Sequence, residues 1–445
     1  MSPNARFVLQ LVQRSFVLGL VLYLLLLPAC GGGSSSSSSP PPSSNGASGS
    51  GSVPGNGSVP SSDSLRSPYT VLTGPNVQPV SVSGDFVYGF INDMLTSVTV
   101  CVPGTTTCQT IPDILVDTGS SGLRLVASQL QLALPAVTSG GTPLGECLEF
   151  VDSFVWGPVV TADVAIADEQ AAAVPIQLLG SPEFAGPPAF CSSSGLPETD
   201  TVASLGANGI LGVGLFAYDC GTVCTSQGPL EPPAIYFSCP SINAPCMPTA
   251  IPLASQVQNP VRLFPQDNNG VLISLPPIDA NGARSVAGTL TFGIGTAANN
   301  GLGNAQVYTP DVFGRFTTIY KGISYPGSYL DTGTSVLSIL IPSILGIPLC
   351  AANTAASGDY CPSTIVSNTA TTLGTNGTTG TVAFNIANAN TLVNSTNWAF
   401  NDLATPFQSS PVAFAWGLPF FFGRNVFVAI EGQSTPAGVG PYWAY

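Results

Sequence analysis

Short apolar runs that alternate with polar or turn-forming residues fill the chain from about position 67 onward. Alternation of apolar and polar residues with a period of two predicts strands that bury one face. Such alternation or short apolar runs occur over 79–91, 95–102, 158–167, 270–278 and 288–295. The 49 glycines and 41 prolines fit many turns and few helices. The pattern therefore predicts an all-β protein built from many short strands.

Two apolar stretches are the best candidates for helices. They are residues 123–130 (LRLVASQL) and 334–345 (TSVLSILIPSIL), and each follows an Asp-Thr-Gly sequence. A hairpin is expected where VPGTTT separates Cys101 from Cys108, with a disulfide closing its tip.

The N-terminus has the pattern of an export signal. Arg6 and Arg14 precede an apolar run over 16–27 that is too short for an ordinary membrane-spanning helix. The run ends in LPAC, which resembles a bacterial lipobox. The resemblance implies that a signal peptide, 1–29, is removed and that Cys30 is lipidated, with Gly31 indicating the outer membrane. A cleaved secretory signal with an incidental cysteine is the alternative.

Residues 30–67 are mainly glycine, serine, proline and asparagine. A segment with so few apolar side chains cannot bury enough surface to offset its ordering entropy. We expect it to be a flexible tether that holds the folded part away from a membrane.

Charge and composition exclude several classes of function. Only 7% of the 445 residues are charged, and 9 basic against 23 acidic residues give a net charge of −14, which argues against nucleic-acid partners. The chain has no histidine, so it has no Ser-His-Asp triad, Cys-His nucleophile or histidine metal ligand. An enzyme of this composition must use carboxylates, hydroxyls or water for proton transfer. We expect neither a metal nor a cofactor.

Cysteine usage also indicates export. Eleven cysteines less Cys30 leave an even number, and these fall in neighbouring couples. An oxidising compartment favours five disulfides among them, although the sequence does not fix their connectivity. A metal site is the weaker alternative because no spacing is C-x2-C. The couples are Cys101 and Cys108, Cys147 and Cys191, Cys220 and Cys224, Cys239 and Cys246, and Cys350 and Cys361.

One short motif occurs twice. VDTGSSGLRL begins at Val116 and LDTGTSVLSI begins at Leu330, and each is followed downstream by an apolar, glycine-containing segment, 207–216 or 413–423. The repeat predicts two lobes of one ancestry, an N-terminal lobe over 68–255 and a C-terminal lobe over 256–445.

These motifs resemble those of the pepsin-like aspartic proteases, in an order and spacing that cover nearly all of 68–445. The segments NGILGVG, GTLTFGIG, WGLPFFFGRNVFVAIEG and VGPYWAY resemble later segments of that family. The resemblance implies an all-β, bilobal fold with two related β-barrel-like lobes and a cleft between them. The lipobox and serine-rich tether also resemble a divergent group of bacterial lipoproteins that look like aspartic proteases.

Two aspartates brought together at the lobe interface would carry the chemistry. Like charges so close cannot both ionise cheaply, so Asp117 and Asp331 would share one proton and act as one acid and one base. The base would activate a water and the acid would protonate the peptide carbonyl. The resemblance assigns supporting roles to both loops. Thr118 and Thr332 would bond to the opposite backbone, Ser120 and Thr334 would bond the outer carboxylate oxygens, and Gly119 and Gly333 would allow a sharp turn.

Two positions depart from the family pattern. In the hairpin EFVDSFVWG, 149–157, Phe150 replaces the usual flap tyrosine, and Arg124 replaces its tryptophan partner. We expect Phe150 and Trp156 to belong to a flap over the substrate. A solvated surface position for Arg124 is one interpretation. In the others, Arg124 points into the cleft and selects acidic substrates, or lowers the pKa of the aspartate pair.

The sequence thus predicts a membrane-tethered aspartic endopeptidase of the bacterial cell envelope, anchored through Cys30 at the outer membrane and facing the periplasm or cell surface. Its partners would be peptide or protein substrates, and we expect a monomer. An inactive relative that binds peptides or envelope ligands is the alternative, and a purely structural lipoprotein is a third.

Overall fold

The computed structural model describes residues 69, 72–226, 235–340, 342–407 and 413–445. The expected signal peptide, Cys30 and the whole tether lie outside these residues. The described part is built mainly from strands, as the alternating pattern predicts. No helix in the described part is long and apolar enough to cross a membrane.

The N-terminal lobe is a closed ring of strands. Its strands pair in the order β7, β8, β4, β9, β3 and β2, and β2 pairs again with β7. A closed ring leaves no strand edge exposed along its sides. The strands of this lobe are β2 (Leu95–Cys101), β3 (Cys108–Asp117), β4 (Ser121–Val126), β5 (Thr138–Ser139), β6 (Thr142–Glu149), β7 (Phe154–Ile166), β8 (Glu169–Leu179), β9 (Gly209–Val213), β10 (Tyr236–Ser238) and β11 (Met247–Pro248).

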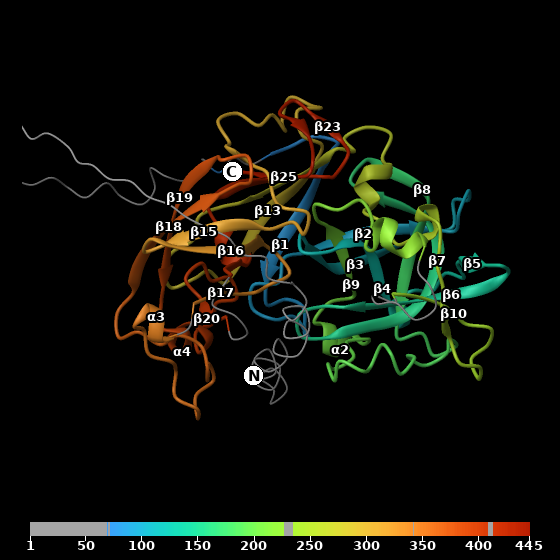
Figure 1. The fold of residues 1–445 in the computed structure, drawn as a ribbon, viewed down its shortest axis with the longest axis horizontal. Helices are drawn as coiled ribbons and strands as arrows, with labels where there is room; N and C mark the ends of the chain where they lie inside the picture. Colours follow the sequence, from blue (N-terminus) through green and yellow to red (C-terminus); the bar gives the residue numbers. More distant parts are fainter. Residues whose placement is uncertain (1–68, 70–71, 227–234, 341, 408–412) are drawn as a thin grey trace, which may run out of the picture.

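The C-terminal lobe contains a seven-stranded sheet in the order β19, β18, β15, β16, β21, β17 and β20. It lies on the left of Figure 1, with the N-terminal lobe on the right. Its strands are β15 (Phe316–Tyr320), β16 (Ile323–Leu330), β17 (Leu337–Ile339), β18 (Val366–Leu373), β19 (Thr379–Ile386), β20 (Ala404–Pro406) and β21 (Ala415–Trp416).

Both lobes repeat one arrangement of strands. In the first, β3 runs parallel to β9, β9 antiparallel to β4, and β4 parallel to β8. In the second, β16 runs parallel to β21, β21 antiparallel to β17, and β17 parallel to β20. The strand preceding each set, β2 or β15, is antiparallel to its neighbour. The shared directions confirm the all-β, bilobal, pepsin-like fold with two related lobes.

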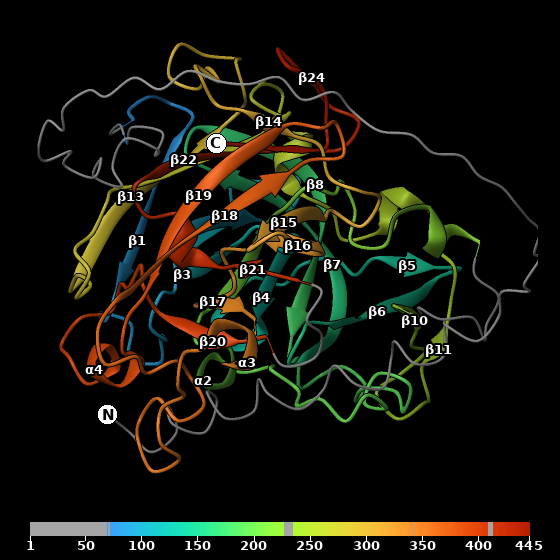
Figure 2. The same cartoon turned by 60° about the vertical axis from the view of Figure 1, so that its left-hand side comes forward.

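A third group of strands joins the lobes. Strand β1 pairs with β2 and, over its whole length, with β13 from the second half of the chain. Figures 1 and 2 show β1 and β13 side by side in both views. The group comprises β1 (Val77–Ser83), β12 (Gly270–Leu275), β13 (Ser285–Phe292), β14 (Val307–Tyr308), β22 (Arg424–Ala429) and β25 (Tyr442–Ala444), with the small hairpin of β23 (Ser434–Thr435) and β24 (Gly438–Val439) beside it.

Helices in the described part are few and short, and of the two stretches expected to be helical only the end of the second, Pro342–Leu345, forms an α-helix. Residues 123–130 form most of strand β4 and then a single 3-10 turn, while 334–345 contain strand β17 and a four-residue helix. The strand segments β4 and β17 form because each pairs with a neighbouring strand on both sides inside a sheet. The helices are α2 (Val202–Leu205), α3 (Pro342–Leu345) and α4 (Ala389–Val393), with 3-10 turns at Ala127–Gln129, Gly221–Thr225, Leu253–Ser255, Pro260–Leu263 and Leu418–Phe420.

All ten cysteines of the folded part form disulfides. Each bridge joins the two members of one neighbouring couple, including Cys220 with Cys224 and the hairpin tip Cys101 with Cys108. The expectation of five bridges is confirmed, and the structure supplies the connectivity that the sequence left open.

Aromatic rings fill the core of the C-terminal lobe. Phe414 stacks on Trp416 with ring centroids 5.3 Å apart, and Phe384 meets Trp416 edge-on at the same distance. Phe414 and Trp416 are completely buried. Since β21 carries Trp416 and pairs with β16, this cluster holds the strand that ends directly before Asp331.

We predict that Phe414→Ala destabilises the protein by about 3 to 5 kcal/mol, because it removes a buried ring and leaves a cavity. Phe313→Ala is the matched control, because Phe313 is 68% exposed. Urea unfolding followed by tryptophan fluorescence measures both variants. Equal loss of stability in the two variants would contradict this description of the core.

Candidate active site

The two Asp-Thr-Gly loops meet where the lobes join. Asp117 is the last residue of β3, and Asp331 follows β16 directly. Strand β3 runs parallel to β9, and β16 runs parallel to β21. The two loops therefore leave equivalent positions in the two lobes. Asp117 is 7% exposed, and Asp331 is half-buried.

Reciprocal hydrogen bonds between the threonines hold the loops together. The backbone N–H of Thr118 donates to the hydroxyl of Thr332 at 3.0 Å, and the N–H of Thr332 donates to the hydroxyl of Thr118 at 3.0 Å. The Thr332 hydroxyl donates in turn to the carbonyl of Val116 at 2.7 Å. Both threonines are buried, so these bonds form in a region of low dielectric where unpaired polar groups are costly.

The glycines after the threonines are required for space. A Cβ atom on Gly119 would lie 2.7 Å from Oδ1 of Asp331, and one on Gly333 would lie 2.8 Å from Oδ1 of Asp117. Neither glycine has a positive φ, so the expected reason, a turn that only glycine can adopt, is wrong. Each aspartate instead faces the glycine of the opposite loop, which brings the carboxylates together.

Each carboxylate also has two donors from its own loop. The N–H of Gly119 donates to Asp117 Oδ1 at 2.7 Å, and the hydroxyl of Ser120 donates to Oδ2. The N–H of Gly333 donates to Asp331 Oδ1 at 2.8 Å, and the Thr334 hydroxyl donates to Oδ2 at 2.7 Å. The two loops therefore donate hydrogen bonds in the same pattern. The Oδ1 atoms, here called the inner oxygens, each lie next to the exposed glycine of the opposite loop.

One of the two aspartates keeps its proton to neutral pH. Burial is the largest cause that raises the pKa of Asp331 to about 7, and the Asp117 carboxylate, which also hydrogen-bonds Asp331, is the second. The bonds from Thr334 and Gly333 act in the opposite direction. Close approach of two carboxyl groups disfavours the ionisation of both, which explains the contribution of Asp117 to this upward shift.

Buried acids outside the pair behave similarly. Burial raises the pKa of Asp93 to about 8 and that of Asp359 to about 7. Asp93 Oδ2 accepts a 2.6 Å bond from the N–H of Phe90. A folded-state pKa above the unfolded value of about 4 means that protonation favours folding, so this stability is complete below about pH 4 and lost as pH rises through 7 to 8.

The β6–β7 hairpin carries the residues expected in a flap. Phe150 begins its turn, where its N–H donates to the carbonyl of Ser153 at 2.8 Å. Its ring is partly buried against Val126 and Leu179 of the N-terminal lobe. A role for Phe150 over a substrate stays a prediction.

Trp156 is a core residue, so its expected contact with substrate is wrong. It is 3% exposed, and its indole N–H donates to the carbonyl of Ala185 at 2.7 Å. The ring packs against Phe184 and Phe237. In the sequence Trp156 is close to the hairpin turn, but its ring points into the core of the N-terminal lobe, against Phe184 and Phe237.

Arg124 is neither solvated nor directed at a substrate. It is completely buried, and its guanidinium forms ion pairs with Glu146 at 2.7 Å and Asp219 at 3.3 Å. The interpretations of Arg124 as a solvated charge and as a residue that selects acidic substrates are therefore wrong, because its ion-pair partners come from distant parts of the chain and leave no exposed atom. Arg124 is also absent from the causes that shift the pKa of Asp331.

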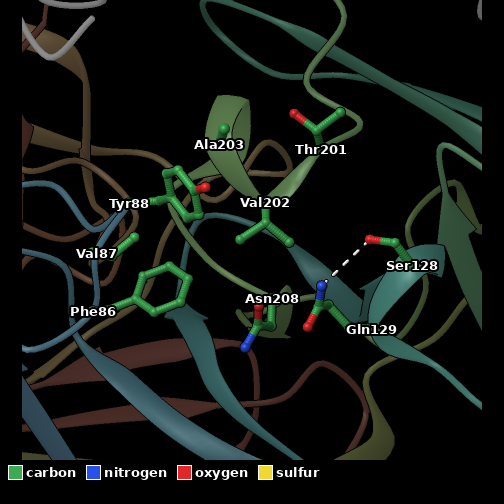
Figure 3. A pocket seen from close by; sticks show the side chains of 9 residues that line it. All are labelled: Phe86, Val87, Tyr88, Ser128, Gln129, Thr201, Val202, Ala203 and Asn208. Atoms are coloured by element: carbon green, nitrogen blue, oxygen red, sulfur yellow. Dashed lines mark hydrogen bonds between the residues drawn. The ribbon is translucent and has the colours of Figure 1, made fainter. Parts of the chain in front are cut away.

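A pocket that the sequence did not reveal lies beside α2 (Figure 3). Phe86, Val87 and Tyr88 line one side and Val202 faces them, while the Gln129 amide donates to the Ser128 hydroxyl at 3.4 Å. The lining contains no charged residue. Asn208, which also lines it, precedes β9, about 13 Å along that strand from the glycine that pairs with Asp117.

Within the described residues, no group of three or more cysteine, aspartate or glutamate side chains could hold a metal ion. The ten cysteines of the folded part are occupied by disulfides.

Comparison with known proteins shows the family. Residues 73–445 match the family model described as "Protein of unknown function (DUF3443)", and the chain belongs to that family. No curated protein matches its sequence. Among solved structures, it is similar to an aspartic proteinase from Irpex lacteus at 14% identity, over 83% of this chain and 96% of that one, with a TM-score of 0.47.

We predict that Asp117→Asn lowers the pKa of Asp331 from about 7 toward its ordinary value without reaching it. The substitution removes the neighbouring charge, whereas burial, the largest cause, remains. Carbon NMR of labelled aspartate carboxyl groups measures the titration. An unchanged pKa would show that the two side chains do not interact.

We also predict that the protein unfolds at a lower temperature at pH 8.5 than at pH 5, because buried acids must lose protons. Asp93→Asn should reduce this difference, since its amide stays neutral at both values. Asp279→Asn, at an exposed position, is the control. Calorimetry showing greater stability at pH 8.5 in the wild type would contradict the sign of these pKa shifts.

Proposed function

We propose that the protein is a membrane-tethered aspartic endopeptidase in which Asp117 and Asp331 activate a water for attack on a peptide bond. The observation that carries the proposal is the crosswise placement of the carboxylates, each within 2.8 Å of the position of a Cβ on the opposite glycine. The proposal needs no cofactor, and its partner is a peptide or protein substrate. The lipid on Cys30, the envelope location and the monomeric state are parts of the same proposal.

The pair has the proton inventory that the reaction needs. The ionised carboxylate takes a proton from the water as it attacks the carbonyl carbon, and the protonated carboxyl donates to the carbonyl oxygen. Ser120 and Thr334 hold the outer oxygens, which keeps the inner oxygens directed at the space between the loops. The pKa of Asp331, raised to about 7 by burial and by Asp117, supports activity on the acidic side of pH 7.

Peptide binding without cleavage is the second candidate. Phe150 favours it, because a phenylalanine in the hairpin turn covers a ligand without donating a hydrogen bond. A bound peptide that stays intact over a long incubation would identify this function, and turnover sensitive to pepstatin would exclude it.

We predict that Asp117→Asn and Asp331→Asn each reduce peptide cleavage by about 10²- to 10⁴-fold, because each removes an acid or base from the pair. Casein and a peptide library, assayed from acid to neutral pH, provide the measurement. Asp279→Asn replaces an exposed acid and should retain wild-type cleavage. No cleavage by the wild type at any pH, or equal cleavage by all proteins, would refute the proposed activity.

A further inference from the structure

Arg124 is a charged residue completely buried in a chain with nine basic residues. It lies in β4, and each nitrogen of its guanidinium has a partner. Nε donates to Gln177 Oε1 at 3.1 Å, and Nη1 donates to the carbonyl of Ser121 at 2.8 Å. Nη2 donates to Glu146 Oε1 at 2.7 Å and to Asp219 Oδ2 at 3.3 Å. Together these partners compensate a charge that is entirely removed from water.

These contacts connect the Asp117 loop to the β6–β7 hairpin. Ser121 follows Ser120, whose hydroxyl donates to Asp117 Oδ2. Glu146 lies in β6, the first strand of the hairpin. Arg124 therefore bonds on one side to the first residue of β4, which directly follows the Asp117 loop, and on the other side to β6 of the hairpin.

The surrounding charges require one proton. We call Arg124, Glu146, Asp219 and Tyr236 the Arg124 cluster. It holds one cation and two carboxyl groups, and the Tyr236 hydroxyl lies 2.7 and 2.8 Å from the two oxygens of Asp219. Glu146 Oε2 is buried and has no donor among the described residues. A proton on Asp219 would supply a donor and make the cluster neutral.

The direction of the pKa shift of Asp219 agrees with a proton on this carboxyl group. Burial raises its pKa well above the ordinary value, and the Glu146 carboxylate raises it further, against the opposing effects of Arg124 and Tyr236. The charged and titratable groups that face Asp219 are these three, from β4, β6 and β10.

We propose that Arg124 is a positioning residue that fixes the β6–β7 hairpin relative to the Asp117 loop, and that it does so while Glu146 and Asp219 share one proton. The inference rests on the proposed peptidase function for its effect on catalysis. Its effect on the hairpin is independent of that function.

Proton sharing makes a specific prediction about carboxyl-to-amide variants. In Glu146→Gln or Asp219→Asn, the remaining carboxylate ionises and balances Arg124. In the double variant the arginine is buried without a counter-ion. We therefore expect each single variant to keep most of its activity and the double variant to lose about 10²-fold in kcat/KM, mainly in kcat, through displacement of the reacting groups.

Asp359→Asn is the matched control, because Asp359 is another buried acid with a raised pKa but belongs to the C-terminal lobe. It should not add to the effect of Glu146→Gln. If the double cluster variant loses only the product of the two single effects, the shared-proton proposal is overturned.

Hydrogen exchange tests the hairpin without reference to activity. In the wild type, exchange of the amides of β6, corrected for intrinsic rates, should accelerate as pH rises and the cluster loses its proton. In Asp219→Asn it should not accelerate. The same pH dependence in both proteins would overturn the proposal. These single variants decide the matter even if the double variant does not fold.

The two proposals fail separately. If the wild type cleaves no substrate but β6 exchange differs as expected, the peptidase function is wrong and the positioning role of Arg124 stands. If cleavage is normal and exchange does not respond to Asp219→Asn, the peptidase function stands and the role of Arg124 is wrong.

Discussion

The contact between Asp117 and Asp331 depends on the reciprocal bonds between Thr118 and Thr332. These two 3.0 Å bonds join backbone and side chain across the lobe interface, 214 residues apart in the chain. The loops follow strands β3 and β16, which pair with β9 and β21 respectively. Gly119 and Gly333 leave space for the carboxylates of the opposite loops. Each element is ordinary by itself, and the duplicated arrangement places them face to face.

The scarcity of basic residues determines the protonation state of the buried acids. With no histidine and nine basic residues in total, few carboxylates can form an ion pair with a basic side chain. Among the described carboxyl groups with a shifted pKa, every shift is upward, with burial as the largest cause. Neutral, protonated acids are thus part of the folded state, and the aspartate pair is one instance of a wider pattern. The Arg124 cluster differs because it includes a cation.

The sequence predicts the strands, the repeat and the aspartate loops because these are local signals. Alternation marks β1, β2 and β13, and the two copies of Asp-Thr-Gly identify both halves of the pair. Prediction from the sequence fails for residues 123–130 and 334–345. An apolar run that is buried on both faces shows no hydrophobic periodicity, so a strand cannot be distinguished from a helix. The strand pairing that decides between them comes from β9 and β21, far along the chain.

The environment of Arg124 could not be predicted for the same reason. Its side-chain partners Glu146, Gln177 and Asp219 are 22, 53 and 95 residues away, and no local pattern marks them as neighbours. Trp156 and the pocket beside α2 depend likewise on which face of a strand or loop turns inward. The reason for Gly119 and Gly333 could not be predicted from the sequence either. Glycine is selected both where a side chain would clash with a neighbour and where the backbone needs an unusual conformation, and only the structure distinguishes these two causes.

The central claim is that two remote carboxyl groups share one proton at a site that solvent can reach. A high-resolution crystal structure at pH 5 tests it most directly. The account predicts an oxygen of Asp117 and an oxygen of Asp331 within about 2.6 to 3.2 Å, with the glycines of both loops exposed. Carboxylates beyond hydrogen-bonding distance, or enclosed away from solvent, would contradict it.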